Sequence, residues 1–366
     1  MMKRLRTLLL MTACSVPLAS VALAQDEASR SFRGGEPDGK SDMAASPAGP
    51  EAELIPPLVI NTDEASRNLP IDDPEELVKG FGTVSKRAGG AEERSEATPE
   101  VGRALRERAR DLVTPNANDD DAVAGDIDPL FSSDRAIVGD DNRIRVEENT
   151  SFPFRTFGLL RMKWGESGGS CSGTLIGPRT VITAAHCIYS HERGGWSETI
   201  TFHPGANGDG NFPYKGYEYE TAHILQGYLD NYKGFYGSVV PWDLAVIVLR
   251  EPAGDRLGWL GYGTNNRRGF LAYNVGYPGD KPYGTMWRDK CDVVAEEMWD
   301  NEYTHRCDTW SGSSGSSMYL FQSNPEDRIV QGVNVAEVKN EDRAKSFNVG
   351  VPLNTGYFEW VRSNRR

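Results

Sequence analysis

Residues 171–187 read Cys171-Ser-Gly-Thr-Leu-Ile-Gly-Pro-Arg-Thr-Val-Ile-Thr-Ala-Ala-His186-Cys187. A β-branched run leads into two alanines, and a histidine follows directly before a cysteine. Small neighbours hold the imidazole of His186 in a reproducible position, as a general base requires. Taken alone, a histidine in such a setting is more often an ordinary buried side chain. The remaining histidines lack a comparable frame, and we assign them to loops or to the surface: His191, His203, His223 and His305.

A single carboxylate opens a second stretch, Trp242-Asp243-Leu-Ala-Val-Ile-Val-Leu249, in which every other residue is apolar. A buried carboxylate without a partner is costly. We therefore predict that Asp243 accepts a hydrogen bond from His186 and fixes the tautomer of its ring. The alternative is an aspartate that faces water at the end of a strand.

The third stretch is Cys307-Asp-Thr-Trp-Ser-Gly-Ser-Ser-Gly-Ser-Ser317. Its Gly-x-Ser-Gly pattern lets the backbone turn tightly around an exposed hydroxyl, and it predicts Ser314 as a nucleophile. The amides of Gly312 and Ser314 are then placed to donate to a developing oxyanion. Ser313 and Ser316 are rival nucleophiles, but only Ser314 has a glycine two residues before it and another directly after it. The alternative is a flexible Ser-Gly linker.

Residues 1–24 have the layout of a secretory signal peptide. A basic start is followed by the apolar run 8–11 and by the small-residue cleavage motif Ala22-Leu23-Ala24. No later run approaches the roughly 18 apolar residues that a membrane helix needs. We expect the mature protein to be secreted, extracellular or periplasmic, without a membrane anchor. Lipidation at Cys14 is the alternative.

Removal of the signal peptide leaves four cysteines, and an even number in an exported chain indicates disulfides. Four cysteines allow three pairings. We predict sequential pairing, Cys171 with Cys187 and Cys291 with Cys307, each bond contributing about 3 kcal/mol through loop-closure entropy. Buried free thiols or a metal site are the alternatives. The CxxC spacing of zinc sites is missing, so we expect no metal.

Residues 25–135 differ from the rest of the chain in composition. They carry 25 acidic and 13 basic side chains, a net charge of −12 against −13 for the whole chain. Every tyrosine and tryptophan lies after residue 136. A segment so poor in large apolar groups struggles to offset its ordering entropy, and we interpret it as a mostly disordered propeptide with one helix at 99–113. A permanent linker or tail is the alternative. Neither part has a basic surface for nucleic acid.

From residue 136 onward, short β-rich runs alternate with Gly, Pro and Asn clusters. Many short strands over about 230 residues indicate an all-β fold. We predict two antiparallel six-stranded β-barrels of the chymotrypsin type, at about 137–250 and 255–350, with the active site between them. Barrels remove the sheet edges that a secreted monomer would otherwise expose. A C-terminal helix should follow at about 354–363, capped by Asn354 or Thr355.

Residues 136–360 resemble the bacterial glutamyl endopeptidases, a branch of the trypsin-like clan of serine proteases. Besides the three stretches above, the resemblance includes Gly276-Tyr-Pro-Gly-Asp-Lys281 and Gly284-Thr-Met-Trp287. The run Ile137-Val-Gly-Asp-Asp-Asn-Arg143 is similar to the mature N-termini of that branch. An animal group of secreted trypsin-like proteases is similar around Cys291-Asp-Val and Cys307-Asp-Thr.

The resemblance implies a serine endopeptidase with the triad His186, Asp243 and Ser314, acting on protein or peptide substrates without a cofactor. Ser314 would attack the carbonyl, His186 would take its proton and later give it to the leaving amine, and Asp243 would orient the ring. The alternative from another class is a catalytically inactive binding protein on the same fold.

The sequence departs from this family where substrate is recognised. The histidine with which family members bind a substrate carboxylate falls on Asn334, whereas Thr309 agrees with the acidic branch. Asp308 lies six residues before Ser314, where trypsin has the carboxylate that binds Arg or Lys. We therefore expect at best a modest preference for cleavage after Glu or Asp, with cleavage after Arg or Lys as the alternative.

A further departure concerns activation. Trypsin receives its new N-terminal amine on a carboxylate directly before the nucleophile, and Ser313 stands there in this chain. Activation through that ion pair is therefore excluded. We predict cleavage at Arg135-Ala136, or within a residue or two of it, separating a propeptide, 25–135, from a protease domain, 136–366. A cut after Arg requires a processing protease unless the enzyme itself accepts basic residues.

Overall fold

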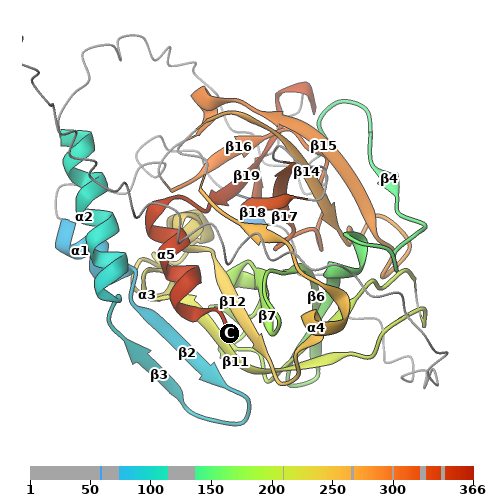
Figure 1. Cartoon of the computed structure of the whole chain (residues 1–366), viewed down its shortest axis with the longest axis horizontal. Helices are drawn as coiled ribbons and strands as arrows, with labels where there is room; N and C mark the ends of the chain where they lie inside the picture. Colours follow the sequence, from blue (N-terminus) through green and yellow to red (C-terminus); the bar gives the residue numbers. More distant parts are fainter. Residues whose placement is uncertain are drawn as a thin grey trace, which may run out of the picture. The chain divides into compact units, whose positions relative to one another are not determined.

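The computed structural model describes residues 58–59, 74–113, 137–208, 210–264, 268–298, 301–321, 327–338 and 343–366. The predicted signal peptide and the predicted cleavage site at Arg135-Ala136 lie outside these ranges. Two large, mostly antiparallel sheets and a C-terminal helix dominate the described chain (Figure 1).

The first sheet closes on itself. Its strands follow the order β10-β5-β6-β7-β12-β11, and β10 pairs with both β5 and β11. The apolar runs recognised in the sequence form its centre, since every residue of β7 and β12 is buried. The six barrel strands are β5 (Phe157–Trp164), β6 (Ser167–Leu175), β7 (Thr180–Thr183), β10 (Thr199–Pro204), β11 (Tyr217–Leu225) and β12 (Ala245–Leu249).

The second sheet follows the order β16-β19-β18-β17-β14-β15-β4, with β1 and β13 paired to β18. Within the described residues this path stays open, so the sheet is a half-barrel beside the closed one. The all-β fold class expected from the sequence is confirmed. One six-stranded barrel is closed, and the second sheet forms a half-barrel. The strands are β1 (Leu58–Val59), β4 (Ile144–Arg145), β13 (Gly261–Tyr262), β14 (Phe270–Gly276), β15 (Trp287–Val293), β16 (Tyr303–His305), β17 (Ser317–Phe321), β18 (Arg328–Val338) and β19 (Phe347–Pro352).

Short elements connect the strands and carry site residues. The helices among them are η2 (Phe154–Thr156), η3 (Ala185–Cys187), α3 (Gln226–Asp230), η4 (Tyr236–Trp242), α4 (Ala253–Leu257), η5 (Ala295–Glu297) and η6 (Arg343–Lys345), and β8 (Tyr189–Ser190) pairs with β9 (Gly195–Trp196). The predicted C-terminal helix is confirmed as α5 (Thr355–Asn364). Its Tyr357 hydroxyl donates to the carbonyl of Pro241, in η4, at 2.6 Å.

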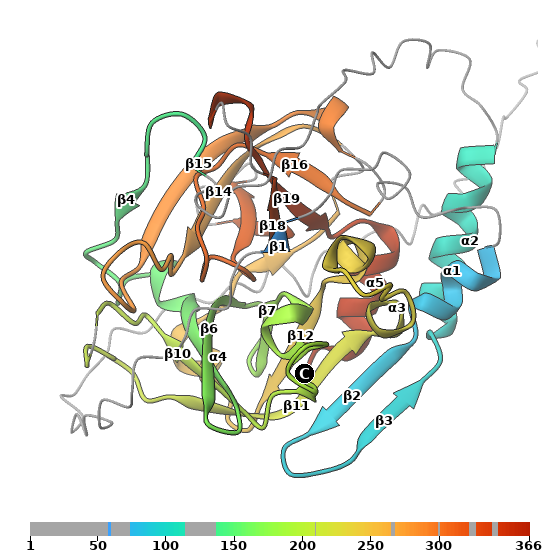
Figure 2. The same cartoon turned by 180° about the vertical axis from the view of Figure 1, so that it is seen from behind.

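Residues 74–113 form a folded N-terminal module. It contains α1 (Pro74–Gly80), β2 (Thr83–Arg87), β3 (Glu92–Ser95) and α2 (Pro99–Val113), so the helix predicted at 99–113 is confirmed. The β2–β3 hairpin continues the first sheet beyond β11, which gives that sheet eight strands. Figures 1 and 2 show the hairpin at the edge of the barrel and α2 next to α5.

Candidate active site

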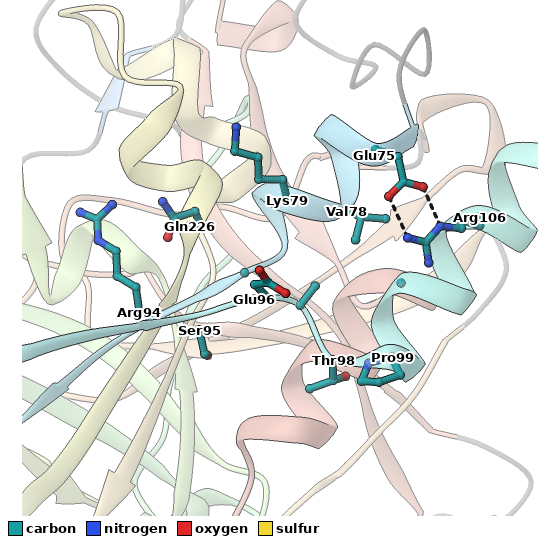
Figure 3. A pocket seen from close by; sticks show the side chains of 13 residues that line it. Glu75, Val78, Lys79, Arg94, Ser95, Glu96, Thr98, Pro99, Arg106 and Gln226 are labelled. Carbon is teal, nitrogen blue, oxygen red and sulfur yellow. Dashed lines mark hydrogen bonds and ion pairs between the residues drawn. The ribbon is translucent and has the colours of Figure 1, made fainter.

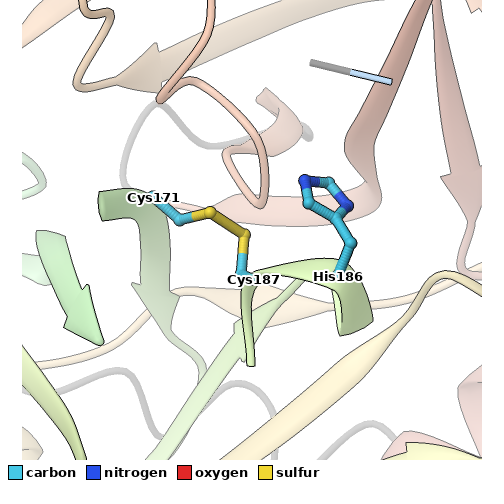
Figure 4. A group of neighbouring side chains, drawn as sticks. All are labelled: Cys171, His186 and Cys187. Atoms are coloured by element: carbon cyan, nitrogen blue, oxygen red, sulfur yellow. A yellow bond between two sulfur atoms is a disulfide. The ribbon is translucent and has the colours of Figure 1, made fainter. Parts of the chain in front are cut away.

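His186 lies in η3, the single helical turn that follows β7. A disulfide joins Cys187, in the same turn, to Cys171 in β6, with their Cα atoms 6.0 Å apart. The imidazole and the disulfide leave this turn in different directions (Figure 4). The His186 side chain is 3% exposed. The predicted disulfide next to the histidine is therefore present.

Asp243 follows η4 directly and is fully buried. Its Oδ1 accepts a hydrogen bond from the backbone amide of His186 at 2.9 Å. Its Oδ2 lies 2.6 Å from Nδ1 of the same imidazole. A carboxylate can only accept, so Nδ1 carries the proton and Nε2 is the basic nitrogen of the neutral ring. Nε2 is buried and accepts no hydrogen bond from any described residue.

Two tyrosines that no sequence motif marks extend this network. The Tyr236 hydroxyl, in η4, donates to Oδ2 of Asp243 at 2.8 Å, and the Tyr228 hydroxyl, in α3, donates to Tyr236 at 3.0 Å. The Tyr236 ring meets the His186 ring edge to face, with centroids 5.6 Å apart. Burial, followed by the charge of Asp243, raises the pKa of both phenols well above its usual value. Both therefore remain neutral donors.

Ser314 lies in a turn that is pressed against the first barrel. Its carbonyl accepts a hydrogen bond from the amide of Ser172, in β6, at 2.8 Å and lies 3.7 Å from Sγ of Cys187. Gly315 adopts a φ of 81°. A Cβ there would fall 2.0 Å from Oγ1 of Thr183, so only glycine fits against β7. The turn thus places Ser314 beside the segment that carries His186.

The amides of this turn divide into two groups. Those of Ser313 and Gly315 donate to the carbonyls of Trp310 and Asn334, at 2.7 and 2.8 Å. Those of Gly312 and Ser314 donate to no described residue. These two are the amides that the sequence assigned to an oxyanion.

Asp308 is buried and faces the start of the described protease part. Its Oδ1 accepts from the amide of Val138 at 2.8 Å, and its Oδ2 accepts from the amide of Asn142 at 2.7 Å. Burial raises the pKa of Asp308, against the lowering effect of these two hydrogen bonds. Both carboxylate oxygens are thus used to hold residues 138–142. Thr309 is buried next to it in the chain, 2% exposed.

Asn334 lies on β18, close to the Ser314 turn. Its Nδ2 donates to the carbonyl of Ser313 at 3.4 Å, and its Oδ1 lies 3.0 Å from Nε2 of His305. His305 is fully buried on β16, and burial lowers its pKa to about 4. The neutral ring therefore donates from Nε2 and orients the Asn334 amide.

The assignment of four histidines to loops or to the surface was wrong for three of them, which lie in strands. His305 is 0% exposed, and His203, on β10, is 6% exposed. Both lie in strands whose burial is set by their partners across the sheet, and a motif search along the chain does not detect that. His223 is half-buried on β11, and His191 is half-buried in the turn that follows β8.

The second predicted disulfide is also present. Cys291, on β15, is bonded to Cys307, and their Cα atoms lie 4.9 Å apart. Sequential pairing is thus confirmed for all four cysteines. Cys307 precedes Asp308, so the bond fixes the start of the segment that ends at Ser314.

A barrel closed beside a half-barrel, with a histidine held by a buried aspartate and a serine turn between them, is the arrangement of trypsin-type serine proteases. Residues 145–361 match the Trypsin family, more than half of the chain. The chain belongs to this family, and it is a peptide hydrolase.

Similar proteins indicate which branch of the Trypsin family the chain resembles. The chain is 35% identical over 232 residues to "Extracellular metalloprotease" of Bacillus subtilis, covering 62% of this chain and 69% of that one. It is 34% identical over 187 residues to "Glutamyl endopeptidase" of Bacillus licheniformis, covering 50% of this chain and 55% of the relative. The solved "Structure of Glu endopeptidase in complex with MPD" aligns with a TM-score of 0.51 at 25% identity, covering 63% of this chain and 99% of that one. The protein is a glutamyl endopeptidase-like serine protease of the chymotrypsin clan.

One of these names implies a metal, and a metal site needs several free ligand atoms close together. Two groups bring possible ligand atoms together, Cys171 with His186 and Cys187, and Cys291 with His305 and Cys307. In both, the two cysteines are joined to each other and supply no thiolate. The single histidine left in each group offers one ring nitrogen at most, because the other is hydrogen-bonded to Asp243 or to Asn334, and one ligand does not make a metal site. Neither group fits a metal ion.

Proposed function

We propose that Ser314, His186 and Asp243 are the catalytic triad of this serine endopeptidase. The observation that carries the proposal is the pair of bonds between His186 and Asp243, which fixes the proton on Nδ1 and leaves Nε2 basic. In this role Nε2 takes the proton of the Ser314 hydroxyl as that oxygen attacks the substrate carbonyl. The imidazolium then protonates the leaving amine, and water releases the acyl group by the same steps in reverse order.

The oxyanion of the tetrahedral intermediate is assigned to the amides of Gly312 and Ser314. Support comes from their lack of acceptors among the described residues, while Ser313 and Gly315, which alternate with them, are already bonded. Donors held in place before the reaction need no reorganisation as charge develops, and removal of one such donor typically costs about 10²- to 10³-fold in kcat.

For specificity, we assign Asn334 and Thr309 to the pocket that receives the substrate side chain before the scissile bond. A neutral amide contributes about 0.5–1.5 kcal/mol to binding a carboxylate, less than the roughly 1.5–3 of a charged donor. A modest preference for Glu or Asp is therefore proposed. Cleavage after Arg or Lys is less well supported, because both oxygens of Asp308 accept backbone amides.

The two disulfides fit an oxidising compartment, outside the cytoplasm. None of the helices in the described ranges combines the length and the apolar composition needed to cross a bilayer. We propose that the protein is secreted and acts as a monomer after a processing protease has cut at Arg135-Ala136.

A fluorophosphonate probe tests the assignment, since it labels only a serine that its own histidine has activated. Tryptic mapping of the labelled protein should place the adduct on Ser314. A protein that is folded and unlabelled would favour the rival function, an inactive binding protein on a protease fold. An adduct on Ser313 or Ser316 would contradict the choice of nucleophile.

A further inference from the structure

The N-terminal module, residues 74–113, completes an edge of the barrel that the barrel strands leave open. On that edge of β11, β10 pairs only with Tyr217 and Glu218. Residues 221–225 of β11 pair instead with β2, in register from Thr221 with Arg87 to Leu225 with Thr83. Without β2, half of this edge would be an unpaired row of backbone groups, which soluble proteins avoid.

The module also supplies side chains to the main apolar core. Phe81, Val84 and Val101 are 1%, 0% and 0% exposed, and they belong to the same buried cluster as the barrel residues. The Phe81 ring packs edge to face on Trp242 and on Tyr357, with centroids 5.4 and 4.8 Å apart. The contact is therefore a continuous hydrophobic core and not a loosely held surface patch.

Polar groups of the protease part depend on the module as well. The indole of Trp360, in α5, donates to Oγ1 of Thr83 at 3.0 Å. The Ser85 hydroxyl lies 2.8 Å from Nδ1 of His223, on β11. Trp360 is only 1% exposed, so loss of the module would leave its buried donor without an acceptor.

The contact reaches the candidate active site through Trp242, the residue directly before Asp243. The Trp242 ring lies so close to the backbone of Gly80 that a Cβ there would fall 2.3 Å from it. Gly227, in α3, approaches the opposite part of the same ring equally closely. The end of α1 thus packs against the end of η4, the element that carries Tyr236 and leads into Asp243.

The two helices of the N-terminal module are bonded to each other, and its two strands are paired, so the module can act as one unit. Figure 3 shows Glu75, of α1, bound through both oxygens to the guanidinium of Arg106, of α2. The two hydrogen bonds are both 2.8 Å long. The hairpin between these helices is paired over four residues of each strand.

We propose that the N-terminal module is a permanent part of the enzyme and not a discarded propeptide. Hydrolysis of the Arg135-Ala136 bond leaves a carboxylate on Arg135 and an amine on Ala136, and the module stays bound to the barrel as a second chain. There it supports the Trp242–Asp243 segment. The proposal rests on the proposed function, because it uses the predicted cleavage and the role of Asp243.

Size-exclusion chromatography of the processed, secreted enzyme in native buffer tests retention. N-terminal sequencing of the main protein peak should give two sequences in equal amounts, one beginning at Ala136 and one beginning upstream of Pro74. A main peak that contains only the Ala136 chain would overturn the proposal. Co-elution is scored without reference to activity, so a failure of the Ser314 assignment and a failure of retention remain distinguishable.

Urea titration of the cut enzyme tests the support of Asp243. The cleaved N-terminal module should dissociate at the urea concentration at which peptide hydrolysis is lost. In Phe81→Ala both events should occur at a lower urea concentration. Glu93→Lys, on the exposed face of β3, is the matched control and should behave as wild type. If Phe81→Ala is not secreted, Thr83→Val removes the hydroxyl that accepts from Trp360 and from Asn364, both in α5, and should still lower the urea concentration of release. Release of the fragment with full activity retained would contradict the proposed support.

Discussion

The hydroxyl of Tyr236 donates to Oδ2 of Asp243 at 2.8 Å, the same oxygen that lies 2.6 Å from Nδ1 of His186. The backbone amide of His186 occupies the other oxygen at 2.9 Å. The buried carboxylate therefore has three donors, which offset much of the cost of taking its charge out of water. Tyr236 is a positioning residue, because it acts on the imidazole through Asp243.

Tyr236→Phe should lower kcat/KM by about 10- to 100-fold, the equivalent of one hydrogen bond to a charged group at roughly 1.5–3 kcal/mol. The carboxylate that has lost a donor attracts the imidazole proton more strongly. The acid limb of the pH profile of kcat/KM should therefore move to higher pH. Steady-state kinetics from pH 5 to pH 9 measure both effects.

Tyr228→Phe is the matched control for this experiment. Its hydroxyl reaches Asp243 only through Tyr236, so the displacement of the acid limb should have the same direction and be smaller. A loss of activity in Tyr236→Phe with an unmoved pH profile would indicate a purely structural role for this residue.

Ser314→Ala should abolish hydrolysis, because the members of a triad act as a unit and removal of one costs on the order of 10⁶ in kcat. His186→Ala should lower kcat by about the same factor. Ser316→Ala loses the bond from Nδ2 of Asn274, 2.8 Å long, and should lose some stability while keeping its activity. Ser313→Ala should also remain active. Hydrolysis of a peptide substrate, normalised to folded protein by circular dichroism, measures the series.

Much of this site could be predicted along the chain because its signals are local. The alanines before His186, the apolar run after Asp243 and the glycines around Ser314 are each contained in one short stretch. The helix at 99–113 also follows from a local pattern of apolar spacing.

The parts that were not predicted depend on partners far away in the sequence. Tyr236 precedes Asp243 by seven residues with no pattern that marks it. All four residues of β3 are exposed, and β2 owes its burial to β11, more than a hundred residues away. His305 lies in a strand of three residues whose neighbours decide that it is buried. Composition along the chain does not contain these contacts.

Three histidines that lie in strands should make the protein sensitive to acid. Burial lowers the pKa of His203, His223 and His305 to about 4 each, whereas in an unfolded chain they titrate at about 6.5. Between these values the unfolded state binds more protons, so the free energy of unfolding falls as the pH falls from about 6.5 towards 4. Each residue contributes at most about 1.4 kcal/mol per pH unit. Urea midpoints measured from pH 7 to pH 4.5 should show this slope.

His203→Gln should remove the contribution of one histidine to the pH dependence of the free energy of unfolding. The variant also loses packing on Phe212, whose ring centroid lies 4.7 Å away. His191→Gln is the control, since that ring is only half-buried and its pKa is lowered less. Equal slopes in wild type and His203→Gln would show that His203 does not resist protonation in the folded state.

The pocket should discriminate weakly between Glu and Gln. Asn334 offers a neutral amide held by His305, which predicts a preference of about 10-fold or less in kcat/KM for Glu over Gln. Asn334→Ala should reduce that ratio towards one.

Asp308→Asn should leave the ratio of kcat/KM between Arg and Glu substrates nearly unchanged, because the oxygens of Asp308 hold the amides of Val138 and Asn142. The same variant should loosen residues 138–142. Matched peptides that differ only in the residue before the scissile bond measure these ratios. A large preference for Arg that is lost in Asp308→Asn would contradict the proposed preference for cleavage after Glu or Asp. A strong preference for Glu that survives Asn334→Ala would place the positive charge of the pocket on another group.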